Sequence, residues 1–428
     1  MKRTKLFLLI GVIICIFISA AFFIIMKKKD QKNKPELPPG RWNIARYLQT
    51  KDTHDETFKK LIGLGYLEGY KPATASENVT VFNKDFAYPG LNFFVSGHGP
   101  EAILMDMEGK VLHTWHYRTA CEIWKNFPCN DPGASNWRRA HLFKNGDVLA
   151  IHEGIGLIKL DKDSHLLWSY TSSRAPHHDL EVVENGNIYI LTMEKKKIPR
   201  ISKTYVYDEF ISILSPEGKL REEFSLIDFI ENSPYAQLLD NDHVKEGGFY
   251  GHILHTNTIE VFDGSLSHTS PLFKKGNVLL SLLIPSTIAI VDIDQREVVW
   301  ALGSGMWKYQ HQPTLLHNGN LLLFDNHDTD NGSQVIEFNP FTQDILWEYR
   351  GNALSTFSSE TCGSNQRLPN GNTLITETDS GRAFEVTPHG TIVWEYINPF
   401  RAGKKKELIA SLFEMTRINP AEYDFAKQ

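Results

Sequence analysis

Cysteine is scarce in this sequence, and neither sign of charge is in large excess. The chain has 428 residues with four cysteines, 22% charged residues and a formal net charge of −6. This weakly acidic balance argues against the basic face that nucleic-acid binding requires, so we expect no nucleic acid partner. The cysteines lack the spacing of a zinc finger. Cys121 and Cys129 enclose the loop CEIWKNFPC, which leaves two alternatives open: a disulfide in an oxidising compartment, or two separate thiols.

One long uncharged hydrophobic run, LFLLIGVIICIFISAAFFIIM, extends from Leu6 to Met26. It is long enough to cross a bilayer as a helix. It also exceeds the hydrophobic region of a signal peptide, and no A-x-A-like cleavage site closes it. We therefore predict an uncleaved transmembrane anchor over residues 1–27. Lysines flank the run on both sides, and long domains cross the membrane largely regardless of such charges, so charge alone does not set the orientation.

Residues 28–87 are expected to form a linker followed by short helices. The stretch 27–40 is polar and contains proline, and apolar residues then follow at roughly helical spacing between Leu48 and Leu64. The spacing ends in glycines, which commonly terminate helices.

A repeated hairpin fills the remainder of the chain. Five segments share an apolar strand, a glycine turn and a second apolar strand: LFKNGDVLAI, VVENGNIYIL, LFKKGNVLLS, LLHNGNLLLF and RLPNGNTLIT. Asn-Gly supplies the positive φ angles that a tight hairpin turn needs. Each hairpin is followed by a second one that ends near an aromatic residue: Trp168, Phe224, Trp300, Trp347 and Trp394. A sixth copy of this second hairpin ends at Trp115.

Four strands per repeat, at a spacing of about 40 to 55 residues, are typical of β-propeller blades. We predict an all-β, six-bladed propeller over residues 88–428. The first blade lacks one hairpin half. We expect a C-terminal strand to complete it, and the candidate is the segment Glu407–Phe425.

Histidines recur at one position of the predicted innermost strands. His178 and His311 each stand seven residues before the asparagine of the following turn. An insertion lengthens the hairpin of the fourth blade, where HTNTIEVF is the better innermost strand and His255 takes the equivalent place. These three histidines are expected to meet at the channel mouth, a usual place for a ligand site. The same offset gives Arg138 in the second blade.

A metal site is another interpretation of these histidines, because neutral imidazoles are good ligands. The three would come from separate blades, without two ligands spaced on one element. The sequence therefore predicts no metal.

Four segments carry a resemblance to a known family: HHDLEVVENGN, HTNTI, QHQPTLLHNGNLLLFDN and NQRLPNGNTLITETDSGRAFEVTPHGTIVWEYINP. From about Tyr88 to Pro399 the chain resembles the bacterial arylsulfotransferase (arylsulfate sulfotransferase) family. The resemblance implies a six-bladed propeller that moves a sulfuryl group from an aryl sulfate to a phenol. It implies neither a nucleotide sulfate donor nor a cofactor. Many members are exported, so we expect a membrane-anchored protein with its large domain in the periplasm or outside the cell.

The resemblance also implies roles for the three histidines. His311 matches the nucleophile, which would become a sulfohistidine, and a neutral imidazole is a competent nucleophile. His178 and His255 match two further channel histidines, which would hold sulfate oxygens or act as acid and base.

The sequence departs from the family at one charged position. Leu283 stands where the family has an arginine that contacts the sulfate, and losing a guanidinium removes a strong anion contact. Arg138, Arg174 and Arg367 are candidates to replace it. For substrate binding we select Arg138 together with three aromatic residues, Trp307, Tyr309 and Phe357, which could stack on an aryl ring or instead pack between blades.

Two other function classes remain open. The first is a catalytically inactive propeller that binds a ligand or assists an assembly, which the missing arginine favours. The second is a quinone-dependent dehydrogenase, whose blades also carry repeated tryptophans. Those enzymes usually have eight blades and a calcium site, and neither is evident in the sequence.

Overall fold

The computed structural model describes residues 71–72, 74–125, 127, 132–303, 305–327, 332–352, 355–402 and 408–427. All of them belong to one unit, Gly40–Gln428. The predicted anchor at residues 6–26 and the helices predicted before residue 70 lie outside this part of the chain. Within it, no helix is long and apolar enough to cross a membrane.

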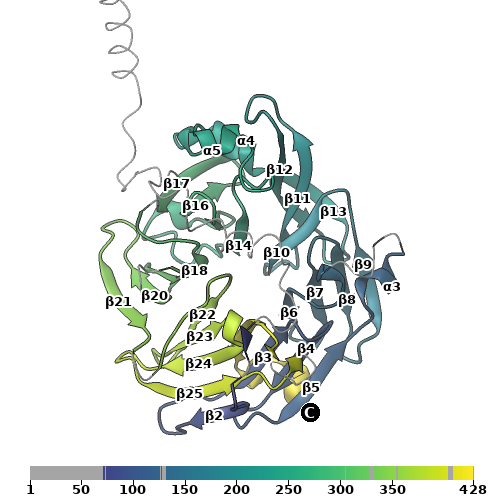
Figure 1. Ribbon diagram of the computed structural model, residues 1–428, viewed down its shortest axis with the longest axis vertical. Helices are drawn as coiled ribbons and strands as arrows, with labels where there is room; N and C mark the ends of the chain where they lie inside the picture. Colours follow the sequence, from purple (N-terminus) through teal and green to yellow (C-terminus); the bar gives the residue numbers. More distant parts are fainter. Residues whose placement is uncertain are drawn as a thin grey trace, which may run out of the picture. The chain divides into compact units, whose positions relative to one another are not determined.

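Six antiparallel sheets surround a central axis, and the chain visits them in order (Figure 1). In each of the first three sheets the innermost strand is named first. Blade one contains β28 (Leu412–Ile418), β3 (Leu91–Ser96), β4 (Glu101–Met105) and β5 (Val111–His116). Blade two contains β6 (Arg139–Leu142), β7 (Val148–His152), β8 (Gly156–Leu160) and β9 (Leu166–Tyr170). Blade three contains β10 (Ala175–Val182), β11 (Ile188–Lys197), β12 (Tyr205–Leu214) and β13 (Leu220–Ser225).

The other three blades follow the same plan. Blade four contains β14 (Thr256–Val261), β15 (Val278–Leu282), β16 (Thr287–Asp292) and β17 (Glu297–Gly303). Blade five contains β18 (His311–Leu315), β19 (Leu321–Asp325), β20 (Gln334–Phe338) and β21 (Ile345–Arg350). Blade six contains β22 (Ser364–Arg367), β23 (Thr373–Glu377), β24 (Arg382–Val386) and β25 (Ile392–Ile397). The six-bladed all-β prediction is confirmed, and so is HTNTIEVF as the innermost strand of blade four.

Both ends of the propeller sequence close the ring. The C-terminal strand β28 pairs with β3 and becomes the innermost strand of blade one, as predicted for the segment Glu407–Phe425. The N-terminal strand β2 (Asn78–Phe82) pairs with β25 and becomes a fifth, outer strand of blade six. The sequence placed residues 78–82 in the linker and helical region, so this second closure was not anticipated.

Most helical segments of the described residues lie in connections between strands, and two 3-10 turns follow the last strand, β28. The α-helices are α3 (Ala120–Ile123), α4 (Leu226–Glu231) and α5 (Asp242–Lys245). The 3-10 turns are η2 (Pro132–Ala134), η3 (Ala236–Leu238), η4 (Pro271–Phe273), η6 (Thr378–Ser380), η7 (Pro420–Glu422) and η8 (Asp424–Lys427). A further small sheet is formed by β1 (Lys71–Pro72), β27 (Leu408–Ile409) and β26 (Arg401–Ala402). Helix α4 buries Phe229 and its apolar neighbours in the core between blades three and four.

Four of the repeated tryptophans connect a blade to the next one. Their indole Nε1 atoms donate to backbone oxygens in hairpin turns of the following blade: Trp115 to Gly146, Trp168 to Pro216, Trp347 to Pro388, and Trp394 to Met107. Phe224 has no such donor, and the Arg296 guanidinium instead lies 5.5 Å from its ring centroid. The aromatic position of the repeat is therefore a contact between blades rather than a ligand site.

Candidate active site

Three consecutive innermost strands carry the candidate histidines with the same irregular backbone. His178 has φ 55° and His255 has φ 52°, while Gln312, next to His311, has φ 47°. The strand register shifts at each place: between Pro176 and Leu180, Thr256 and Thr258, and His311 and Thr314. Left-handed backbone is uncommon outside glycine and costs free energy, and it concentrates at functional sites. Its recurrence on three neighbouring blades indicates a shared local design.

The three candidate histidines are buried. His178, His255 and His311 are 5%, 4% and 3% exposed. The rings of His178 and His255 meet edge to face, with centroids 4.8 Å apart. His178 and His255 thus lie in contact, and His311 interacts electrostatically with both. The prediction placed them at the channel mouth, and the structure adds that all three side chains are buried.

Hydrogen bonds determine the tautomer of His311. Its Nδ1 lies 2.8 Å from Asn326 Oδ1 and 2.9 Å from the backbone oxygen of Tyr309. The Asn326 amide is itself oriented, because its Nδ2 donates to the backbone oxygens of Ser359 and Cys362. Both neighbours of Nδ1 are therefore acceptors, so Nδ1 carries the proton and Nε2 carries the lone pair. That Nε2 has no hydrogen-bond partner among the described residues.

Burial favours the neutral form of three imidazoles here, those of His311, His255 and His177. It lowers the pKa of His311 to about 3, and the positive charge of Arg138 acts in the same direction. Burial and the neighbouring histidines hold the pKa of His255 well below its ordinary value. Burial also lowers the pKa of His177 to about 4. Neutral imidazoles can attack an electrophile or bind a metal, whereas protonated ones cannot.

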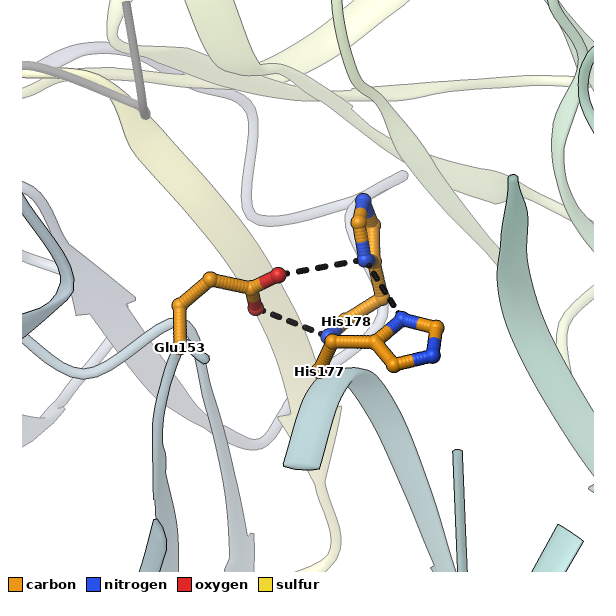
Figure 2. A group of neighbouring side chains, drawn as sticks. All are labelled: Glu153, His177 and His178. Atoms are coloured by element: carbon orange, nitrogen blue, oxygen red, sulfur yellow. Dashed lines mark hydrogen bonds and ion pairs between the residues drawn. The ribbon is translucent and has the colours of Figure 1, made fainter. Parts of the chain in front are cut away.

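A glutamate holds His178 from two sides, as Figure 2 shows. The His178 backbone N–H donates to Glu153 Oε2 at 2.8 Å, and the ring Nδ1 lies 3.2 Å from Glu153 Oε1. The neighbouring His177 places its Nδ1 2.9 Å from the same Nδ1 of His178. Burial opposes ionisation of Glu153, but His178, His177 and Arg138 outweigh it and hold its pKa at about 2. Glu153 is thus a carboxylate facing two imidazoles.

A second glutamate supports His255 in the next blade. Both oxygens of Glu209 accept backbone N–H groups, from His255 at 2.9 Å and from Thr256 at 2.7 Å. His252 places its Nδ1 3.4 Å from Nδ1 of His255. The left-handed backbone at His255 is therefore fixed by a fully buried carboxylate.

Arg138 is the cationic group of the site. Its side chain is buried, one guanidinium nitrogen lies 3.5 Å from Cys362 Sγ, and its Cζ lies 5.2 Å from the centroid of the Phe413 ring. Its charge lowers the pKa of both His311 and Glu153, which places it within electrostatic reach of both. Of the three arginines considered, Arg174 pairs with Glu223 and Arg367 pairs with Glu337. Because its charge acts on His311, Arg138 stays the candidate replacement for the family arginine.

Leu283 lies directly beside this group. Its backbone N–H donates to the oxygen of His255 at 3.2 Å. Its side chain is fully buried and packs with Ile284 and Tyr309. The position that resembles the family's arginine is therefore next to the histidines, and an apolar contact occupies it.

The predicted aromatic residues divide into two sets. Tyr309 belongs to the site, because its backbone oxygen contacts His311 and its side chain packs on Leu283. Trp307 packs in the core between blades four and five, and Phe357 in the core between blades five and six. For these two, the structure matches the alternative of packing between blades.

Sequence reasoning missed Glu153, His177, Glu209, His252 and Asn326. Weak signals existed: the His177–His178 doublet, the HILH segment that contains His252, and the Asp-Asn pair that ends β19. The two glutamates had no such signal in the sequence, because each lies in a different blade from the histidine that it holds.

The structure describes one of the two cysteines predicted to pair. Cys121 is disulfide-bonded, and Cys129 lies outside the described residues. Their pairing stays a prediction.

A cavity of about 490 Å³ opens between the innermost strands away from the histidines. Arg139, Asp179, Glu181, Gln312 and Glu414 contribute to its lining, which contains none of His178, His255 and His311. Arg139 pairs with Asp179 at 2.7 Å and with Glu414. Three residues of this lining, Arg139, Asp179 and Gln312, directly follow Arg138, His178 and His311 in the sequence.

Comparison with known proteins agrees with the resemblance. No curated protein matches the chain. Among solved structures, a Bacteroides caccae protein of unknown function has a TM-score of 0.49 and 12% identity, covering 77% of this chain and 98% of its own. A streptogramin B lyase has a TM-score of 0.42 and 13% identity, and the match covers 82% of this chain and 98% of the lyase. The WD40 β-propeller domain of Doa1 has a TM-score of 0.42 and 12% identity, and the match covers 78% of this chain and 87% of that domain. These likenesses are too distant to bear on function. The family model described as arylsulfotransferase (ASST) matches residues 139–399. The chain belongs to the arylsulfotransferase family.

Proposed function

We propose that this protein transfers a sulfuryl group from an aryl sulfate to a phenol, with Nε2 of His311 as the nucleophile. One observation carries the proposal: Nδ1 of His311 faces two oxygen acceptors, so the lone pair is on an Nε2 that has no partner among the described residues. Family membership supports aryl sulfates and phenols as the substrate classes.

The two half-reactions balance through this imidazole. In the first, the Nε2 lone pair attacks sulfur, the bond between sulfur and the aryl oxygen breaks, and the aryl oxide leaves with the electron pair. The resulting sulfohistidine is an imidazolium whose Nδ1–H stays bonded to Asn326 and Tyr309, and these acceptors stabilise its charge. In the second, a phenol oxygen attacks sulfur and the electron pair of the N–S bond returns to Nε2.

The neighbouring groups have distinct roles in this proposal. Arg138 supplies positive charge for the sulfuryl oxygens, in place of an arginine at position 283. His178 and His255 donate to sulfate oxygens and exchange the proton of the leaving or attacking phenol. Removing one donor to a developing anion costs about 10²–10³-fold in rate, and one acid–base group contributes about 10²–10⁴-fold.

Turnover of a chromogenic aryl sulfate with phenol as acceptor tests the proposal. We expect turnover by the full chain and none by His311→Ala. Incubation with the donor alone should add the mass of one SO3 group to the peptide that contains His311. His165→Ala, in which an exposed histidine is removed, is the matched control. A folded wild-type chain that neither turns over any of several aryl sulfates nor gains this mass would refute sulfuryl transfer.

That negative outcome would support the second candidate, a propeller that binds a ligand without chemistry. The observation favouring it is Leu283, which puts an apolar side chain where the family's arginine would contact sulfate. Isothermal titration would then distinguish a protein that binds aryl sulfates or phenols from one that binds neither class of compound.

We also propose that residues 6–26 anchor the chain in a membrane, with the propeller on the periplasmic or extracellular side. The uncharged hydrophobic run supports the anchor. Resistance to alkaline extraction from membranes tests it, and protease digestion of intact cells tests the side. Release of the full-length chain by alkali would contradict the anchor.

A further inference from the structure

Two adjacent histidines of β10 direct their Nδ1 atoms to one point, which an ordinary strand does not allow. Successive side chains of a β-strand point to opposite faces. His178 has φ 55° and the strand register shifts between Pro176 and Leu180, so the alternation is broken there. As a result, Nδ1 of His177 and Nδ1 of His178 lie 2.9 Å apart, and both rings are buried.

A carboxylate from the preceding blade completes this group. Glu153 Oε1 lies 3.2 Å from Nδ1 of His178, and the three donor atoms of Glu153, His177 and His178 lie within 4.8 Å of one another (Figure 2). The other oxygen, Oε2, accepts the His178 backbone N–H and thereby aims Oε1 at the imidazoles. Two nitrogens and one oxygen thus converge on a single place.

We propose that Glu153, His177 and His178 bind one divalent transition-metal ion, with Zn²⁺ as the probe. Two imidazoles and one carboxylate form a known zinc donor set, with a fourth position left for water or substrate. Zinc ligands lie about 2.0–2.2 Å from the metal, so two ligands of one tetrahedral ion are about 3.3 Å apart. The distances of 2.9 Å and 3.2 Å need only small adjustments. Calcium and magnesium prefer oxygen ligands, so this set discriminates against them.

The competing explanation uses a proton instead of a metal. In that explanation, one Nδ1–H of His178 donates a bifurcated hydrogen bond to Glu153 and His177. A divalent ion would engage the three lone pairs separately. It would hold His178 through Nδ1. The prediction of no metal considered only His178, His255 and His311, and this group contains just one of them.

The next blade provides an internal comparison. His252 and His255 also face each other through Nδ1 atoms, at 3.4 Å, with Glu209 close by. Both oxygens of Glu209 already accept backbone N–H groups, from His255 and Thr256. We therefore expect no second metal there, and His252→Ala is the matched control variant.

The test is Zn²⁺ binding by the full chain, purified in detergent without a polyhistidine tag and treated with a chelator. We expect isothermal titration to show one strong equivalent in the parent and in His252→Ala. His177→Ala and Glu153→Gln should weaken that equivalent by at least about tenfold. Co²⁺ should give visible d–d absorption that the same two variants lose, and Mg²⁺ should not compete.

The outcomes are separable from those for sulfuryl transfer, because no readout uses turnover. Absence of a strong equivalent in the parent, or equal affinity in His177→Ala and Glu153→Gln, overturns the metal site and favours the shared proton. Circular dichroism of the metal-free variants checks folding. His177→Gln, which keeps a polar side chain without an imidazole, replaces His177→Ala if the latter fails to fold.

Discussion

Nδ1 of His311 lies 2.8 Å from Oδ1 of Asn326, and this contact determines which ring nitrogen has the lone pair. The amide cannot turn around without losing its two bonds to the Ser359 and Cys362 oxygens. In the proposed mechanism, Asn326 is thus a positioning residue for the nucleophile.

Asn326→Ala should therefore lower kcat for aryl sulfate much more than it raises KM. The imidazole can then rotate or change tautomer, and losses from such errors are about 10²–10⁴-fold. Steady-state kinetics measure the split. Asn320→Ala is the control, because Asn320 is also a buried amide of blade five but bonds to Glu337 away from the histidines. Equal effects of the two substitutions would contradict the positioning role.

Arg138→Lys should reduce kcat by about 10²–10³-fold. Lysine keeps the charge but lacks the planar fork that matches sulfuryl oxygens. The substitution should leave the Kd of a neutral phenol unchanged, since phenol offers no anion to bind. Arg174→Lys is the matched control, because Arg174 pairs with Glu223 of the outer strand β13. If Arg138→Lys retains wild-type kcat, another group supplies the charge.

Leu283→Arg tests what the departure from the family means. The new guanidinium would enter a fully buried apolar contact with Ile284 and Tyr309, so we expect the free energy of unfolding to fall by about 3–5 kcal/mol. Sulfate or an aryl sulfate should recover part of the loss by pairing with the charge. Leu283→Met preserves volume and should cost less than about 1.5 kcal/mol. Urea titrations with and without sulfate measure both, and no recovery would show that an anion does not reach this position.

The low pKa of His311 predicts acid lability. The folded value is about 3 and the ordinary value is 6.5, so the unfolded chain binds the proton first as pH falls. The contribution of neutral His311 to the free energy of unfolding is present above about pH 6.5 and is lost progressively down to about pH 3. Over that range the free energy of unfolding falls by up to about 1.4 kcal/mol per pH unit. His311→Gln should flatten the fall in unfolding free energy between pH 6 and 4 by up to that slope. His165→Gln, at an exposed site, should leave the slope unchanged.

The fold was accessible from sequence because its signals are local and repeated. Each Gly turn, as at Gly319 with φ 83°, lies within one hairpin, and six aromatic strand ends fixed the number of blades. His178 and His311 were found by the same periodicity. Glu153 could not be found in that way, because it comes from blade two and meets His178 only after the blades pack. Burial also depends on packing, so the sequence could not show that all three histidines are buried.

Ring closure depends on Arg417 in β28, which is fully buried with Glu385 of β24 at 2.9 Å. Arg417 also bonds Asn92 Oδ1 of β3 at 2.7 Å and the backbone oxygen of Tyr88, so it joins the C-terminal strand to blades one and six. Arg417→Met should lower the free energy of unfolding by about 3–5 kcal/mol, because Glu385 is left as an uncompensated buried charge.

The double variant Arg417→Met/Glu385→Gln distinguishes this cause from simple loss of packing. Glutamine carries no charge. The free energy of unfolding of the double variant should therefore be lower than that of wild type but higher than that of Arg417→Met alone. Urea unfolding of the four members of the cycle gives the coupling energy. Glu385 also accepts N–H groups from Tyr88 and Asn372, and a glutamine oxygen can keep one of them. Additive effects would mean that the Arg417–Glu385 ion pair contributes no coupling energy to the closure of the ring.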